Sequence, residues 1–202
     1  MKLSFNKRLQ EICNKKNSHL CIGLDIDPER FPSGRDTSLQ GMETFAKEVI
    51  DGTIELCPAY KPNFAFYERF GSEGYALLER IVDYVSGRAI IIADAKRGDI
   101  GNTSRQYARA ILNTMGCDAI TVSPYLGRDA IEPFIKNPDK GVFILAVTSN
   151  PSARELQEHG GTSNPLYKKV IQLAVELNQG DNIGLVVGAT QVEVMEDIRK
   201  HS

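Results

Sequence analysis

Apolar runs of strand length alternate along the chain with segments that carry apolar residues at helical spacing. Several of the runs are apolar at consecutive positions, as strands are when both faces of a parallel sheet are covered. The strand candidates are residues 19–27, 56–63, 89–96, 117–124, 141–149 and 182–190. The helix candidates include residues 38–55, 74–87 and 103–116. This repeated order predicts an α/β fold with a parallel sheet, either an open doubly wound sheet or a barrel.

Polar residues at the carboxyl ends of the predicted strands favour the barrel. These residues are Asp25, Lys61, Asp94, Lys96, Ser123, Ser149 and Thr190. In a barrel all such strand ends meet on one face, where barrel enzymes have their active sites. A doubly wound nucleotide-binding sheet would instead carry a glycine-rich G-x-G-x-x-G turn after its first strand, and none follows here. Six strand–helix units can be counted, so we expect a TIM (β/α)8-type barrel with about six units in this chain, forming one partial domain over residues 1–202.

Composition and charge narrow the classes of partner. The 24 basic and 26 acidic residues are scattered along the 202-residue chain, which argues against nucleic acid or an anionic membrane as the partner. The apolar runs are too short to span a bilayer and the N-terminus has no signal-peptide core, so we expect a soluble, cytoplasmic protein. The four cysteines are far apart and only three histidines accompany them. We therefore expect reduced structural thiols, with Cys21 in the core, and no metal site.

Charged residues end the most apolar strand, in the stretch IIADAKRGDIGNT over residues 91–103. Residues two apart on a strand point the same way, so we expect Asp94 and Lys96 to share a face with Ile92 below them. Lys61 would bring a second cation to the same rim. Alternating Lys and Asp side chains hold each other charged and can keep a lysine ready to donate a proton. The alternative is a solvated surface ion pair, which D-x-K alone commonly makes.

The motif D-x-K-x-x-D in DAKRGDIGNT resembles the signature of orotidine 5'-phosphate decarboxylases. The segments LCIGLDIDPERFP, AYKPNFAFYERFG, TVSPYLGRDAIEPF and VTSNPSARELQ also resemble that family, in the branch often called type 2. The resemblance extends over nearly the whole chain. It implies a TIM barrel that converts orotidine 5'-monophosphate to uridine 5'-monophosphate and CO2 in pyrimidine biosynthesis, without metal or organic cofactor.

The resemblance also implies roles for the charged residues. Lys96 matches the lysine that donates the proton to C6 of the pyrimidine. Asp94 matches the aspartate near the departing carboxylate, which orients that lysine. Lys61 completes the charged array and contacts the ribose.

Further residues of this family bind the substrate, in part across a subunit interface. Asp99, with Ile100 and Thr103, matches the residues that reach the active site of the neighbouring subunit, so a homodimer with shared sites is implied. Asp25 matches the aspartate that binds a ribose hydroxyl. Ser149 matches the serine that reads the pyrimidine edge.

Structural roles remain open for several of the polar loop residues. Ser149 and Asn150 precede Pro151 and would make a good turn and helix start, and Asp27 before Pro28 would make an equally good turn. Ser123, Tyr125 and Arg128 receive no chemical assignment.

One part of the family pattern is missing from the 202 residues. The glycine-rich loop after a seventh strand and the Gly-Arg pair that grip the substrate phosphate are not found. Because binding of a remote phosphate helps such enzymes assemble their site, we expect this chain to be a piece of a decarboxylase and its activity alone to be depressed.

Two alternatives to this function stay open. The first is a magnesium-dependent sugar-phosphate decarboxylase or aldolase of the same superfamily, although Lys61 stands where that enzyme needs an acidic metal ligand. The second is a catalytically dead barrel that serves as a dimerisation module.

Overall fold

A computed structural model describes residues 3–161, 164–190 and 192–199. These residues form two compact units. The N-terminal unit consists of residues 7–95 and 109–120, and the C-terminal unit of the described residues among 1–6, 96–108 and 121–202.

The secondary structure follows the predicted alternation, with one strand at each predicted strand segment. The strands are β1 (Cys21–Gly23), β2 (Ala59–Lys61), β3 (Ile90–Arg97), β4 (Ala119–Val122), β5 (Gly141–Val147) and β6 (Ile183–Val187). The α-helices are α1 (Phe5–Lys16), α2 (Leu39–Thr53), α3 (Ala65–Glu68), α4 (Gly71–Val85), α5 (Gly101–Ala108), α6 (Arg128–Ile135), α7 (Ala153–Gln157), α8 (Leu166–Leu177) and α9 (Val192–Arg199). Short 3-10 helices are η1 (Pro28–Arg30) and η3 (Asn178–Gly180), and η2 (Arg109–Thr114) is a π-helical continuation of α5.

Strands β1, β2 and β3 of the N-terminal unit run parallel, in the order in which the chain makes them. Their register aligns Gly23 with Lys61 and Tyr60 with Ile91. Strand β3 is buried on both faces from Ile90 to Ala95, which explains its unbroken apolar run. Neighbours that follow one another without reversal are what a barrel sheet has, whereas a doubly wound sheet reverses its order at a switch point.

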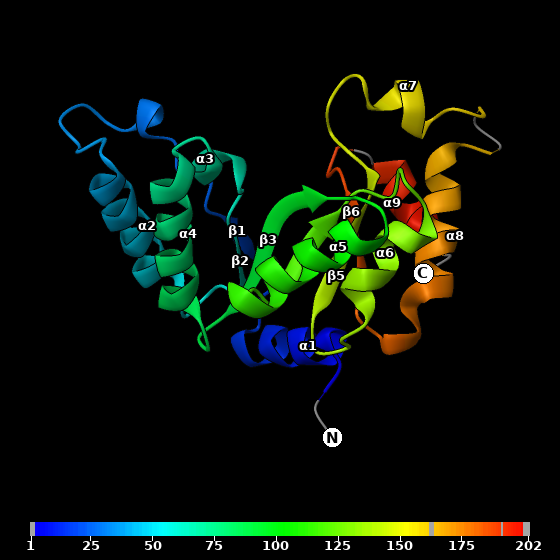
Figure 1. Ribbon diagram of the computed structural model, residues 1–202, viewed down its shortest axis with the longest axis horizontal. Coiled ribbons are helices and arrows are strands. Elements are labelled where there is room, and N and C mark those ends of the chain that lie inside the picture. Colours follow the sequence, from blue (N-terminus) through cyan, green and yellow to red (C-terminus); the bar gives the residue numbers. More distant parts are fainter. Residues whose placement is uncertain (1–2, 162–163, 191, 200–202) are drawn as a thin grey trace. The chain divides into compact units, whose positions relative to one another are not determined.

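Helices α2 and α4 lie side by side in the N-terminal unit (Figure 1). Helix α2 begins where the Ser38 hydroxyl accepts a hydrogen bond from the backbone N–H of Gly41, at 3.2 Å, which satisfies one of the free N–H groups of the first turn. Its buried residues Met42, Ala46 and Ile50 recur every four positions. That spacing puts them on one face of the helix and gives the unit its core.

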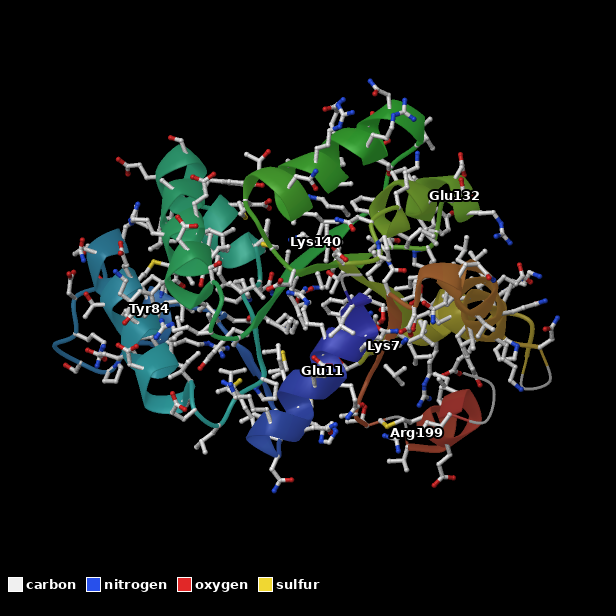
Figure 2. All side chains as sticks on the ribbon, turned by 90° about the horizontal axis from the view of Figure 1, so that it is seen from below. Lys7, Glu11, Tyr84, Glu132, Lys140 and Arg199 are labelled. Atoms are coloured by element: carbon white, nitrogen blue, oxygen red, sulfur yellow. The ribbon has the colours of Figure 1, made fainter. Side chains whose placement is uncertain are left out.

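A buried carboxylate joins these two helices. Glu43 of α2 is 6% exposed and pairs with the Lys47 ammonium and the Arg80 guanidinium, each at 2.8 Å. The hydrogen bonds from Lys47 and Arg80 lower the pKa of Glu43 although burial alone would raise it. Tyr84 of α4, labelled in Figure 2, adds a second bridge because its hydroxyl donates to the Asp51 carboxylate of α2 at 2.7 Å.

Strands β5 and β6 of the C-terminal unit are also parallel, and α8 packs on them (Figure 1). The N-terminal segment packs against the amino ends of these strands. Phe5 is 1% exposed, its ring meets the ring of Phe143 edge-on with centroids 6.0 Å apart, and a methyl group on Gly141 would lie 2.3 Å from it. Ser4 fixes the segment by donating a hydrogen bond to the Asp181 carboxylate at 2.6 Å.

The cysteines are free thiols, and three of them are buried: Cys13, Cys57 and Cys117. The prediction that Cys21 lies in the core is wrong, because the residue is exposed. Strand β1 stands at the end of the strand order, and its alternate residues Cys21 and Gly23 are exposed. No helix in the described part of the chain combines the length and the apolar character that a membrane crossing requires.

Candidate active site

The predicted site residues are divided between the two units. The N-terminal unit carries Asp25, Lys61 and Asp94, and the C-terminal unit carries Lys96, Asp99, Ile100, Thr103 and Ser149. Asp94 and Lys96 are joined through one strand, β3, two residues apart.

Lys61 and Asp94 are brought together at the carboxyl ends of β2 and β3. The Lys61 ammonium lies 3.1 Å from an Asp94 carboxylate oxygen. Asp94 is 9% exposed, whereas the Lys61 side chain is one-third exposed. The pairing of β2 with β3 continues past Lys61, since Asp94 donates its backbone N–H to Pro62 and accepts one from Phe64. A carboxylate buried this deeply needs a cation beside it, and the aligned ends of two parallel strands supply one.

Asp25 lies two residues beyond β1, in a segment that is anchored from behind. Its neighbours Leu24 and Ile26 are buried while Asp25 is exposed, so the alternation of an extended chain turns its carboxylate outward. The buried Tyr67 hydroxyl donates to the Leu24 carbonyl at 2.7 Å, and burial raises the pKa of Tyr67. Asp27 caps η1 by accepting from the Glu29 N–H at 3.2 Å, as its structural interpretation predicts.

Lys96 departs from the strand geometry that we expected. Its φ is +45°, a left-handed conformation that is unfavourable for a side chain with a Cβ. The rule that alternate residues share a face holds only for extended backbone, so strand alternation does not determine the direction of the Lys96 side chain, and its placement on the face of Asp94 stays a prediction. Lys96 is exposed, and its backbone N–H donates to the hydroxyl of Thr121 on β4 at 2.9 Å.

Asp99, Ile100 and Thr103 lie together at the start of α5. Asp99 is partly buried and accepts from the Ile100 N–H at 2.7 Å, whereas Ile100 is 60% exposed and Thr103 is exposed. The buried Ser104 holds this turn in place, because its hydroxyl lies 2.6 Å from the Asp99 carbonyl and 3.0 Å from the Ala130 carbonyl of α6.

Ser149 is exposed in the loop after β5 and lines a cavity of about 300 Å³ formed by this loop and α7. Gln157 of α7 shapes the loop by accepting from the Thr148 N–H at 2.9 Å and donating to its hydroxyl at 2.8 Å. The interpretation of Ser149 as a helix cap is wrong, since the residue before α7 is Ser152 and its side chain makes no capping bond. Ser149 is therefore available to a bound molecule.

Comparison with known proteins gives the family. Residues 18–202 match the model of the orotidine 5'-phosphate decarboxylase / HUMPS family. The chain belongs to this family.

Curated and solved members of the family agree with this assignment. The orotidine 5'-phosphate decarboxylase of Roseiflexus castenholzii is 44% identical over 200 residues, which are 98% of this chain and 73% of that protein. The enzyme of Dehalococcoides mccartyi strain BAV1 is 45% identical over 201 residues with the same coverage. The structure of Leishmania donovani OMP decarboxylase is similar with a TM-score of 0.88 and 38% identity, over 98% of this chain and 76% of that one. The predicted α/β fold of the TIM-barrel type is confirmed.

Three residues that shape the candidate site were missed by sequence reasoning. Thr121, Gln157 and Tyr67 each bond a loop or strand end that carries a predicted site residue. They left little signal, because a threonine or tyrosine within an apolar strand or helix is ordinary. Among the described residues, no group of three His, Cys, Asp or Glu side chains is placed to hold a metal ion.

Proposed function

We propose that this chain decarboxylates orotidine 5'-monophosphate to uridine 5'-monophosphate and CO2. One observation carries the proposal: a buried carboxylate, Asp94, paired with Lys61 at 3.1 Å, stands two residues before Lys96 at the end of a buried strand in a chain of this family. The relatives from Roseiflexus and Dehalococcoides are named for this reaction.

The reaction needs a proton donor beside a carbon that becomes negatively charged. When the bond between C6 and the carboxylate breaks, CO2 leaves and the electron pair stays on C6. The Lys96 ammonium stabilises that charge and then gives its proton to C6, which yields the product. We assign Asp94 to the side of the departing carboxylate, where it also orients Lys96, and Lys61 to the charged array and the ribose. No cofactor takes part in these steps.

The remaining site residues bind the substrate in this proposal. Asp25 accepts a hydrogen bond from a ribose hydroxyl, and Ser149 binds the pyrimidine edge in its cavity after β5. Asp99, Ile100 and Thr103 act in the site of a second copy, so the protein works as a homodimer, in the cytoplasm. The exposed side chain of Ile100 supports a contact of this kind.

Lys61 also separates this function from magnesium-dependent chemistry on sugar phosphates. Its ammonium stands at the carboxyl end of β2 and occupies an oxygen of Asp94. A cation at that position repels Mg²⁺, which requires oxygen ligands.

An ultraviolet assay tests the proposal. Orotidine 5'-monophosphate loses its characteristic absorbance when it becomes uridine 5'-monophosphate, and the purified protein should produce this change. Lys96→Ala should abolish it, while Lys15→Ala, a change of an exposed lysine on α1, should leave it intact. An unchanged spectrum at high protein concentration contradicts the function, and an active Lys96→Ala protein contradicts the role of the lysine.

A further inference from the structure

We propose that Thr121 is a positioning residue that fixes the direction of Lys96 through the backbone. The inference rests on the proposed function for its catalytic consequence, and on the strand geometry for its structural one. Thr121 lies on β4, where all four residues are buried, and is itself 2% exposed.

The β3 strand contains one residue more than its partner segment over this stretch. The N–H of Asp118 bonds to the Ile91 carbonyl, and the N–H of Ser123 bonds to the Arg97 carbonyl. Six steps lead from Ile91 to Arg97, but five lead from Asp118 to Ser123. The extra residue makes a β-bulge, and Lys96 with its φ of +45° is the residue with bulge geometry.

A bulge leaves a backbone group without its regular ladder partner. At Lys96 the N–H goes to a side chain, the Thr121 hydroxyl at 2.9 Å, rather than to a carbonyl. A β-branched threonine suits this task because its side chain has few rotamers and a buried N–H must find a partner. The hydroxyl therefore stabilises a conformation that lysine would otherwise avoid.

The residues that follow Lys96 are held against the same segment. A methyl group on Gly98 would lie 3.1 Å from the Ser123 carbonyl, so the two backbones approach closely there. The Arg97 guanidinium lies 5.4 Å from the centre of the Tyr107 ring on α5. With the strand end fixed on both sides, loss of the Thr121 bond should act on Lys96 itself.

The consequence is a rotation of the lysine. If Lys96 relaxes to extended backbone, its side chain turns relative to the neighbouring strand residues. A displacement of about 1 Å in a catalytic group can cost on the order of 100-fold in rate. Binding of the substrate by other residues should change little, so the defect should appear in kcat rather than in KM.

Three variants test this role. Thr121→Val removes the hydroxyl at nearly constant size, Thr121→Ser keeps it, and Thr44→Val is the matched control, because Thr44 is an exposed threonine of α2 that bonds within its own helix. Thr121→Val should lower kcat by about 10- to 100-fold with KM within about threefold. Thr121→Ser and Thr44→Val should stay near the unchanged protein. A Thr121→Val protein with full kcat, or a Thr121→Ser protein as impaired as Thr121→Val, overturns the proposal.

A second readout does not require activity. Hydrogen exchange of the Lys96 amide, followed by ¹⁵N NMR, should be slow in the unchanged protein and in Thr121→Ser, and faster in Thr121→Val, with other strand amides unaffected. Equal exchange in all proteins overturns the positioning role. If no protein converts the substrate but the exchange pattern holds, the proposed function has failed while the structural role of Thr121 stands.

Discussion

Asp94 shows at the scale of a single residue why a charge can end a buried strand. The carboxylate is nearly inaccessible, and Lys61 at 3.1 Å offsets the cost of its burial. The two residues depend on each other, because removing either one takes away this ion pair and leaves the other charge less compensated.

A double-mutant cycle measures this dependence. Lys61→Met should lower the free energy of unfolding by about 2 kcal/mol, the scale of a lost hydrogen bond to a charged group. Asp94→Asn should lower the free energy of unfolding much less on the Lys61→Met background than in the otherwise unchanged protein. On that background the ion pair is already lost, and the substitution removes a carboxylate that has no Lys61 ammonium beside it. Urea unfolding gives the four free energies, with Lys15→Met as the control. Strictly additive costs would show that the pair is not coupled.

Lys96 was predicted as a site residue, but its conformation was not. The chain itself shows D-x-K-x-x-D, and this spacing is visible in any reading of the sequence. The bulge depends on how β3 pairs with β4, which no local pattern contains. The exposure of Cys21 was mispredicted for a similar reason. An apolar strand segment does not indicate whether its strand will have neighbouring strands on both sides.

At the scale of elements, buried charge also joins helices α2 and α4. The amphipathic spacing predicted both helices over nearly their full lengths. The Glu43 bridge could not be predicted, because Lys47 and Arg80 are common helix-surface residues, and only the packing of the two helices makes them partners of a buried carboxylate.

The lowered pKa of Glu43 gives this bridge a pH dependence. A carboxyl whose pKa is lower in the folded state contributes stability above its ordinary value of 4.5 and loses it as the pH falls through the folded value. Glu43→Gln should therefore lower the free energy of unfolding by about 2 kcal/mol at neutral pH, and the difference should shrink below pH 4.5. Urea unfolding over a pH series measures this, with Glu79→Gln on the exposed face of α4 as control. A difference that is independent of pH would contradict the charged role.

The helical segment after β3 shows another limit of prediction by pattern. A single helix was expected over residues 103–116, and the structure contains α5 followed by the π-helical turn η2. The spacing of apolar residues does not distinguish a π-helical turn from an α-helical one, because one extra residue in a turn leaves the buried face of the helix nearly unchanged. The existence of an element is thus easier to predict than its internal geometry.

At the scale of the whole molecule, the central question is whether one site requires two chains. If Asp99 acts in the site of a second copy, two inactive variants should complement each other. In a hybrid dimer of Lys96→Ala and Asp99→Ala, one site has both residues intact and the other has neither. Equal mixing with subunit exchange should restore about a quarter of the unchanged activity, because about half of the dimers are hybrids and each has one intact site.

The same mixture gives a different result if Asp99 serves its own chain. Every site in the hybrid then lacks one residue, and no activity returns. Mixing Lys96→Ala with Asp94→Ala is the control, since both residues belong to the same chain's site and no complementation is expected.

The most direct test of the account is the fate of the proton at C6. The reaction is run in D2O with orotidine 5'-monophosphate, and the product is followed by proton NMR. The account predicts uridine 5'-monophosphate with deuterium at C6, formed by the unchanged protein and not by Lys96→Ala. Unconverted substrate at high concentrations of the unchanged protein, or equal product from Lys96→Ala, would contradict it.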